Sequence, residues 1–182
     1  VVFIILAGFS VKSIFSHVGA NRELLAMVAY EPILIAMAVG FFLLNGTFDI
    51  SAIRDNSSSL SSLWLLFLAF LLVIPIKLKK SPFDATEAHQ EIVGGVEIEF
   101  SGVFFEFLYM AKWLEYVFVY LLLILFAGDN LLLALFLFAM VFLVVNLVDN
   151  ATARVKINHL IKIVLSIGLT ISIINLLGLS YV

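Results

Sequence analysis

Long apolar runs alternate with short polar connections along this chain. Five runs have about the length, near 20 residues, that a helix needs to cross the hydrocarbon core of a bilayer. These runs are residues 24–44, 60–76, 102–127, 131–148 and 157–179. The pattern predicts an all-α, polytopic transmembrane helix bundle with about five complete spans.

A sixth apolar run, residues 1–9, stands at the beginning of the chain. As a helix it would measure about 13 Å, less than half of the roughly 30 Å hydrocarbon thickness. No signal-peptide pattern and no initiating Met precede it. We expect this run to be the end of a further transmembrane helix, a partial first span, and residues 1–182 to form a single membrane domain.

Composition narrows the class of protein further. Hydrophobic residues make up 64% of the chain, which leaves too little polar surface for a soluble domain. The absence of Cys excludes disulfides, iron–sulfur ligation and thiol catalysis within the chain. The three His residues are not spaced as metal ligands, so no metal site is predicted. The net charge of −3, without a basic tract, argues against nucleic-acid binding.

Lys and Arg are unevenly distributed over the connections, which predicts the orientation of the bundle. Connections 10–23, 77–101 and 149–156, with the adjoining helix end, hold eight of them, whereas the opposite side holds only Arg54. The positive-inside rule places these three connections in the cytoplasm and the protein in the cell membrane. The Ser-rich connection 45–59 is predicted to face outward.

The connection 77–101 is long and acidic, and its sequence predicts a short amphipathic helix. Residues 81–84, Ser-Pro-Phe-Asp, have the pattern of a helix start, with Ser as N-cap, Pro at the first helical position and Asp at the third. The pair Gly94-Gly95 predicts the end of this helix.

On such a helix Asp84, Glu87 and Glu91 would share one face, and Glu97 and Glu99 follow before the next span. One reading is a solvated acidic face with Asp84 as a simple cap. The mostly apolar neighbours favour the other reading, a partly buried segment. Buried carboxylates that lie close together have raised pKa values unless a partner supplies positive charge, and such groups suit proton transfer.

Five ionisable residues lie in or at the ends of the predicted spans: Glu31, Glu106, Lys112, Glu115 and Asp149. A charge near the bilayer centre costs roughly 2.5–3.5 kcal/mol, so these groups should face the bundle interior or a wet cavity. Helix rise places Lys112 near the middle of its span, where Glu115 can pair with it. We expect the acidic side chains to form a series that leads from the loop to Lys112, which we call the ladder. The alternative for each group is a purely structural ion pair.

Residues 81–102 resemble a known family. Their sequence, SPFDATEAHQEIVGGVEIEFSG, is similar to the loop between the fifth and sixth helices of complex I subunit one and its bacterial counterpart, approximately PFD-x-x-EAE-x-EL-x-x-G-x-x-x-EYSG. Arg22 and the Tyr30-Glu31 pair also look like family positions. The resemblance covers essentially the whole chain, as the C-terminal part of an eight-helix family. The matching loop positions are Pro82, Phe83, Asp84, Glu87, Ala88, Glu91, Gly95, Glu99, Ser101 and Gly102.

The resemblance implies a subunit that cups a peripheral arm and carries acidic residues into the membrane. Together with the charges inside the spans, it gives a predicted proton or ion pathway of Glu31, Asp84, Glu87, Glu91, Glu97, Glu99, Glu106, Lys112, Glu115 and Asp149. Arg22, Pro82, Phe83 and His89 are predicted to dock the peripheral arm or to line a cavity beneath it. No catalytic residue is predicted in this chain.

Departures from the complex I pattern favour a particular branch. Thr86, His89 and Lys112 stand where complex I usually has Pro, Glu and Glu. Residues 88–91 and 22–25 look more like the corresponding segments of membrane-bound, energy-converting nickel–iron hydrogenases, including the archaeal enzyme. The resemblance then implies a non-catalytic subunit that couples ferredoxin-driven proton reduction to proton or sodium-ion translocation.

That reading places every cofactor in other subunits. The nickel–iron centre and the iron–sulfur clusters would belong to the hydrogenase large and small subunits, and antiporter-like subunits would be further membrane partners. Three alternatives remain open: a quinone-binding subunit of NADH-quinone oxidoreductase, the equivalent subunit of a sulfur-reducing sister complex, and an independent ion transporter.

Overall fold

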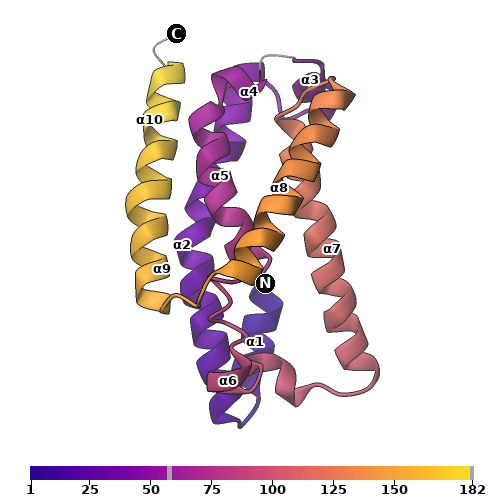
Figure 1. Cartoon of the computed structure of the whole chain (residues 1–182), viewed down its shortest axis with the longest axis vertical. Helices are drawn as coiled ribbons and strands as arrows, with labels where there is room; N and C mark the ends of the chain where they lie inside the picture. Colours follow the sequence, from indigo (N-terminus) through magenta and orange to yellow (C-terminus); the bar gives the residue numbers. More distant parts are fainter. Residues whose placement is uncertain (57–58, 181–182) are drawn as a thin grey trace.

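The computed structural model describes residues 1–56 and 59–180, and this part of the chain is an all-α bundle of upright helices (Figure 1). The predicted fold class is confirmed. Residues 57–58, within the connection predicted to face outward, lie outside the described part. The elements are α1 (Val2–Ser10), α2 (Ile14–Asn45), α3 (Ile50–Asp55), α4 (Ser59–Ser62), α5 (Trp64–Lys77), α6 (His89–Ile92), η1 (Gly95–Glu99), α7 (Val103–Leu125), α8 (Leu131–Ala151), α9 (Ile157–Ile163), η2 (Val164–Gly168) and α10 (Leu169–Ser180).

Four helical segments of the described chain are long and apolar enough to cross a membrane: α2, α7, α8 and the continuous stretch Ile157–Ser180. The fifth expected span is the shorter α5, which has 14 residues and follows α4 after Leu63. The protein is therefore an integral membrane protein. The first apolar run forms α1, which packs beside the first half of α2.

Helix α2 begins ten residues before the predicted span, because Ser13 caps it by accepting a hydrogen bond from the Ser16 amide. Its 32 residues correspond to about 48 Å, more than a hydrocarbon core requires. The additional turns therefore extend past the other spans toward α6 and η1 (Figure 1).

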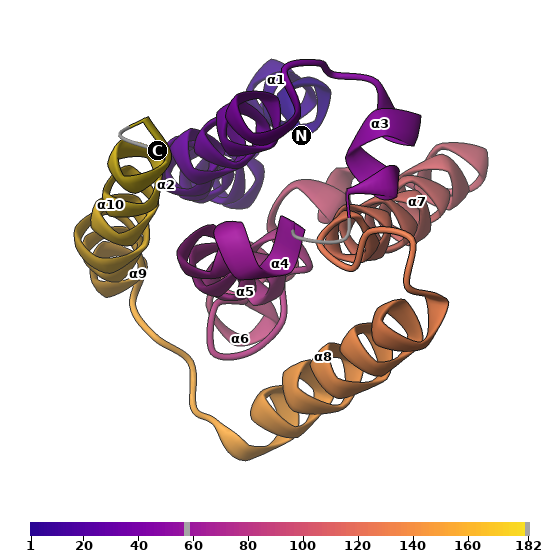
Figure 2. The same ribbon diagram turned by 90° about the horizontal axis from the view of Figure 1, so that it is seen from above.

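The core lies between α2, α5, α7 and the last helix, with α5 central when the bundle is viewed along its axis (Figure 2). Ile33, Leu66 and Leu123 are fully buried there. Phe126 packs among Phe41, Phe67 and Phe70, with ring centroids 5.0, 5.2 and 6.1 Å away. The outward faces of α7 and α8 instead expose large apolar side chains, as expected for helices in contact with lipid.

The three connections predicted to be cytoplasmic meet at one end of the bundle, which we call the loop end. Ion pairs Arg22–Glu91 and Arg154–Asp84 join them, with N–O distances of 2.7 Å in both. Helices α3 and α4 and the α7–α8 turn lie at the opposite end (Figure 1). The alternation of sides is thus confirmed, and the assignment of the loop end to the cytoplasm stays a prediction.

The predicted loop helix starting at Ser81 does not form, and that prediction was wrong. Residues 81–88 pass through turns, and α6 contains only four residues. It ends at Ile92, two residues before the Gly94-Gly95 pair that predicted its end.

Long-range partners replace the local capping bonds at the expected helix start. The Ser81 hydroxyl donates to the carbonyl oxygen of Thr152 at 2.9 Å, and the Asp84 carboxylate accepts two bonds from Arg154. Neither side chain therefore caps the first amides of a helix. Without that capping, the sequence pattern does not stabilise a helix start at Ser81.

The loop rests on α2 through backbone contact at Gly19. A Cβ atom added there would lie 2.7 Å from the Gly95 Cα atom and 3.0 Å from the Val96 amide nitrogen. Backbone atoms cannot move aside as a side chain can. We expect Gly19→Ala to destabilise the protein by about 1–3 kcal/mol and to loosen the loop.

Thermal unfolding of the purified protein in detergent measures this effect. Gly178→Ala is the matched control, because a Cβ atom there would meet nothing within 4 Å. It should be neutral or slightly stabilising, since Ala favours helix over Gly. Equal melting temperatures for the two variants would contradict the close approach.

Candidate functional site: a buried charge network at the loop end

Five side chains of alternating charge form a continuous network at the loop end, which we call the charge network. Lys79 Nζ lies 3.3 Å from Glu23 Oε2 and 2.7 Å from Glu87 Oε1. Lys112 Nζ lies 2.8 Å from Glu87 Oε2 and also contacts Glu97. The order is therefore Glu23, Lys79, Glu87, Lys112, Glu97, and Glu87 is the bridge between the two lysines.

The members come from elements that are distant in the sequence. Glu23 lies in α2, Lys112 in α7 and Glu97 in η1, whereas Lys79 and Glu87 lie in the loop. Lys79 adopts a left-handed backbone conformation (φ 53°) that reverses the chain after α5. That conformation is unfavourable for a side chain with a Cβ atom by roughly 1–2 kcal/mol, and its two ion pairs compensate.

Burial makes the charges of the network interdependent. The side chains of Glu23 and Lys79 are only 8% and 13% exposed. Burial alone lowers the pKa of Lys79, but the carboxylates of Glu23 and Glu87 raise this pKa above its ordinary value. Burial alone raises the pKa of Glu87, but Lys79 and Lys112 outweigh it and hold that pKa below its usual range. Three carboxylates share two ammonium groups, so the network has a formal charge of −1.

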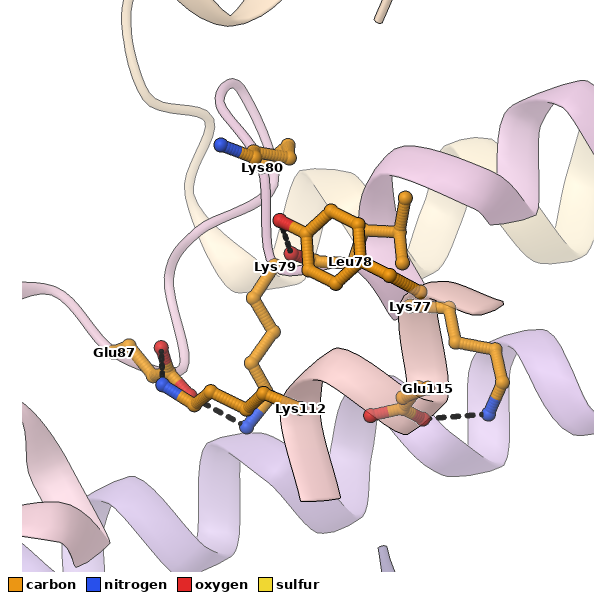
Figure 3. A pocket seen from close by; sticks show the side chains of 8 residues that line it. Lys77, Leu78, Lys79, Lys80, Glu87, Lys112 and Glu115 are labelled. Carbon is orange, nitrogen blue, oxygen red and sulfur yellow. Dashed lines mark hydrogen bonds and ion pairs between the residues drawn. The ribbon is translucent and has the colours of Figure 1, made fainter. Parts of the chain in front are cut away.

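A cavity of about 200 Å³ adjoins the network and connects it to a second ion pair. Lys77 Nζ lies 2.9 Å from Glu115 Oε1 and 5.2 Å from the centre of the Tyr30 ring. Figure 3 shows Glu87 near Lys112 on one side of this cavity and the Lys77–Glu115 pair on the other. The cavity thus brings together charges from α5, α7 and the loop.

The outer part of the loop is fixed to the bundle by arginines. Arg154 binds Asp84 through two bonds of 2.7 Å and lies 3.8 Å from Glu91. Arg22 pairs with Glu91 at 2.7 Å and donates to the Ala85 carbonyl oxygen at 2.9 Å. The two bonds from Arg154 lower the pKa of Asp84, so this carboxyl remains ionised.

Six of the nine acidic residues predicted as a pathway pair with cationic side chains. Asp84, Glu87 and Glu91 do not share a helix face, and the pKa values of Asp84 and Glu87 are lowered rather than raised. Asp149 pairs with Lys80 at 3.1 Å and also accepts from the Ser81 amide. Asp84, Glu87 and Glu91 thus do not repel one another as an aligned row would, because each of them pairs with a cation.

The structure corrects the predicted ladder at Lys112. Lys112 does not pair with Glu115 but with Glu87 and Glu97, and Glu115 pairs with Lys77. Helix α7 begins far out at the loop end, and the loop folds back toward it (Figure 1). Lys112 therefore meets loop carboxylates instead of the predicted partner on its own helix.

Three predicted pathway residues lie apart from these contacts. Glu31 is half-buried in α2, whereas Glu99 and Glu106 are exposed, and none of the three forms an ion pair within residues 1–56 and 59–180. Their role in a pathway stays a prediction.

The predicted docking residues divide into an inner and an outer group. Phe83 packs against the hydrophobic core, and the Pro82 carbonyl accepts a 2.8 Å bond from the Val155 amide. His89 is exposed beside Glu91, which is 48% exposed. His89 is thus more exposed than Pro82 and Phe83, and docking of a peripheral arm by these residues stays a prediction.

Sequence reasoning missed five members of these ion pairs: the cations Lys77, Lys79, Lys80 and Arg154, and the carboxylate of Glu23, which pairs with Lys79. The cations among them were used only to predict orientation. A signal was available, because an acidic loop next to three closely spaced lysines predicts pairing between them.

Together, the spans and the charge network define the class: a polytopic membrane protein with a cluster of buried, paired ionisable groups at one end of its bundle. The family follows from comparison. The NADH dehydrogenase family matches residues 1–180, and the chain belongs to this family. The family predicted from the loop motif is thereby confirmed, and the hydrogenase branch stays a prediction.

The relatives agree in sequence and in fold. NADH-ubiquinone oxidoreductase chain 1 of Myxine glutinosa is 30% identical over 73% of this chain and 43% of its own length. The corresponding subunit of the NADH-quinone oxidoreductase of Rubrobacter xylanophilus is 35% identical over 55% of this chain and 32% of its own length. A chain of the membrane-bound sulfane sulfur reductase, an archaeal respiratory membrane complex, has the same fold, with a TM-score of 0.85 and 22% identity over 97% of this chain and 64% of that one. The chain thus spans less than half of the two sequence relatives.

Proposed function

We propose that this chain is a non-catalytic membrane subunit of a complex I-like respiratory complex, in which it anchors a peripheral arm and couples redox chemistry there to ion translocation. The observation that carries the proposal is the charge network. It joins a solvent-facing loop to two transmembrane helices through buried ion pairs. Ionisable groups buried in a membrane protein typically mark ion or proton pathways.

The balance of charges provides a mechanism. Two lysines pair with three carboxylates, so a small displacement of the loop leaves one carboxylate without a cation. Burial then raises the pKa of that carboxylate, and it takes up a proton. Return of the loop lowers the pKa again and releases the proton. Movement of the loop would thereby be converted into protonation and deprotonation.

Small cavities beside the network support proton transfer. One of about 20 Å³ touches Glu23, Lys79, Glu87 and Glu97 and the hydroxyl-bearing Thr86. This volume accommodates one water molecule, and a water with several polar neighbours can relay a proton. The Thr86 hydroxyl is buried and has no hydrogen-bond partner in the described part of the chain, so it offers a further group to such a water.

For the type of complex, we propose a membrane-bound hydrogenase that takes electrons from ferredoxin and moves protons or sodium ions. The residues at 88–91 and 22–25 support this branch. The nickel–iron centre and iron–sulfur clusters would be held by the hydrogenase large and small subunits, with antiporter-like subunits as further membrane partners. A sulfur-reducing complex is the second candidate, because a chain of the sulfane sulfur reductase shares the fold. Identification of the co-purifying soluble subunits distinguishes the two.

A substitution at Lys112 tests the coupling mechanism. Lys112→Met removes one of the two cations that hold the Glu87 pKa low, while burial continues to raise it. Glu87 will then protonate at a higher pH, because its charged form has lost a partner. The pH below which coupled activity falls should move upward, as measured by ion uptake into vesicles that contain the purified complex. Lys112→Arg keeps the charge and should keep the profile, whereas an unchanged profile in Lys112→Met would refute the mechanism.

A further inference from the structure

Helix α7 carries a row of aromatic residues on the face that turns toward α8. Tyr109, Trp113, Tyr116 and Tyr120 are spaced four, three and four residues apart, which places them on one side of a helix. The ring centroids of Tyr109 and Trp113 are 6.2 Å apart, and those of Trp113 and Tyr116 are 6.1 Å apart.

Helix α8 covers this row only at Tyr120, the member farthest from the loop end. Tyr120 packs on Phe138 at 4.9 Å and on Phe142 at 6.3 Å. Toward the loop end the two helices diverge, as both views show (Figures 1 and 2), and Tyr109 and Trp113 remain 54% and 60% exposed. A cavity of about 450 Å³ lies in the resulting gap, a size suited to a small ligand.

The cavity has a polar, donor-rich end and an apolar end. Lys80 lies at the polar end and extends away from the Lys79–Glu87–Lys112 cluster (Figure 3). Asp149 accepts only one of the three N–H groups of its ammonium, and Lys112 lines the same cavity. The hydroxyls of Tyr109 and Tyr120 and the Trp113 indole add further donors, whereas Phe142 and Val145 form the apolar end. A ligand that matches these walls has an anionic, acceptor-rich head and a hydrocarbon tail.

We propose that this cavity binds one anionic phospholipid, with its phosphate near Lys80 and an acyl chain along Tyr120 and Phe142. The lipid is the occupant because the cavity opens between two transmembrane helices whose outer faces are apolar and exposed, where lipid is the surrounding solvent. Basic pockets between helices at the membrane surface recognise anionic headgroups in this way, and Trp and Tyr are favoured at that depth. The bound lipid would seal the gap between α7 and α8 beside the charge network.

Native mass spectrometry of the purified complex after detergent washing tests the site. One anionic phospholipid per copy should be retained, and phosphatidylglycerol added in detergent micelles should bind about tenfold or more tightly than phosphatidylcholine. Lys80→Gln should weaken phosphatidylglycerol binding by about the same factor, while Lys80→Arg should preserve it. Equal binding of the two lipids would overturn the proposal.

A steric pair of variants locates the lipid independently of charge. Asn146→Trp fills the cavity and should abolish retention of the lipid. Asn150→Trp introduces the same side chain one turn farther along α8, outside the cavity lining, and should leave retention unchanged. Retention in both variants, or photo-crosslinking from position 113 to a partner subunit instead of lipid, would overturn the proposal.

Discussion

Replacement of Glu87 by Gln is expected to abolish ion translocation by the assembled complex, with a loss of about a hundredfold or more. Glu87 is the bridge of the charge network, since Lys79 and Lys112 each bind one of its two carboxylate oxygens at 2.7 and 2.8 Å. Gln is almost isosteric but neutral, and it cannot exchange a proton. A positioned acid–base group typically contributes about 10²–10⁴-fold to proton transfer, and its loss accounts for the expected size of the effect.

The measurement is ion uptake per electron transferred in vesicles that contain the complex. Asp55→Asn is the control, because Asp55 is exposed in α3 at the opposite end of the bundle and has no ion pair within the described residues. It should retain normal translocation, and both variants should assemble with the peripheral arm. Normal uptake by Glu87→Gln would show that the charge network is only structural, and the proposed coupling would then fail.

Loss of the Arg154–Asp84 pair should produce a large effect on stability. Its two bonds of 2.7 Å fasten the loop to the connection between α8 and α9, and both side chains are 27% exposed. Because the pair is only partly buried, we expect Arg154→Ala to cost about 1.5–3 kcal/mol, the range for hydrogen bonds to charged groups. The loop should also become more susceptible to protease.

The pH dependence of stability provides a second test of this pair. Arg154 lowers the pKa of Asp84 in the folded protein, so the pair stabilises the fold above the pKa of Asp84 in the unfolded chain. That stabilisation is lost as the pH falls through the lower, folded pKa. Asp84→Asn should remove this acid-dependent part of the unfolding free energy.

Unfolding in detergent at several pH values measures these differences. Arg54→Ala is the control, because Arg54 and Asp129 are 3.6 Å apart and are 63% and 72% exposed at the opposite end of the bundle. Exposed pairs contribute about 0–1 kcal/mol. Equal losses for Arg54→Ala and Arg154→Ala would contradict a fastening role for Arg154.

The sequence by itself determined the class of protein, the approximate spans and the family. Apolar runs of membrane length can be satisfied only as helices in lipid, because every backbone amide and carbonyl must be paired within the segment. The distribution of Lys and Arg also assigned the connections to two sides correctly, as the Arg22–Glu91 and Arg154–Asp84 pairs show. These features depend on local composition, which can be read directly from the chain.

Only the tertiary structure decided the partners of the acidic residues. Local pattern predicted a helix from Ser81 and a Lys112–Glu115 pair, but each group found a partner distant in the sequence, such as Arg154 for Asp84. Ion pairing is short-ranged and does not depend on sequence separation, so the fold determines which cation a buried carboxylate meets. The same cause lowers the pKa of Glu87, which its acidic neighbours in the sequence would have raised.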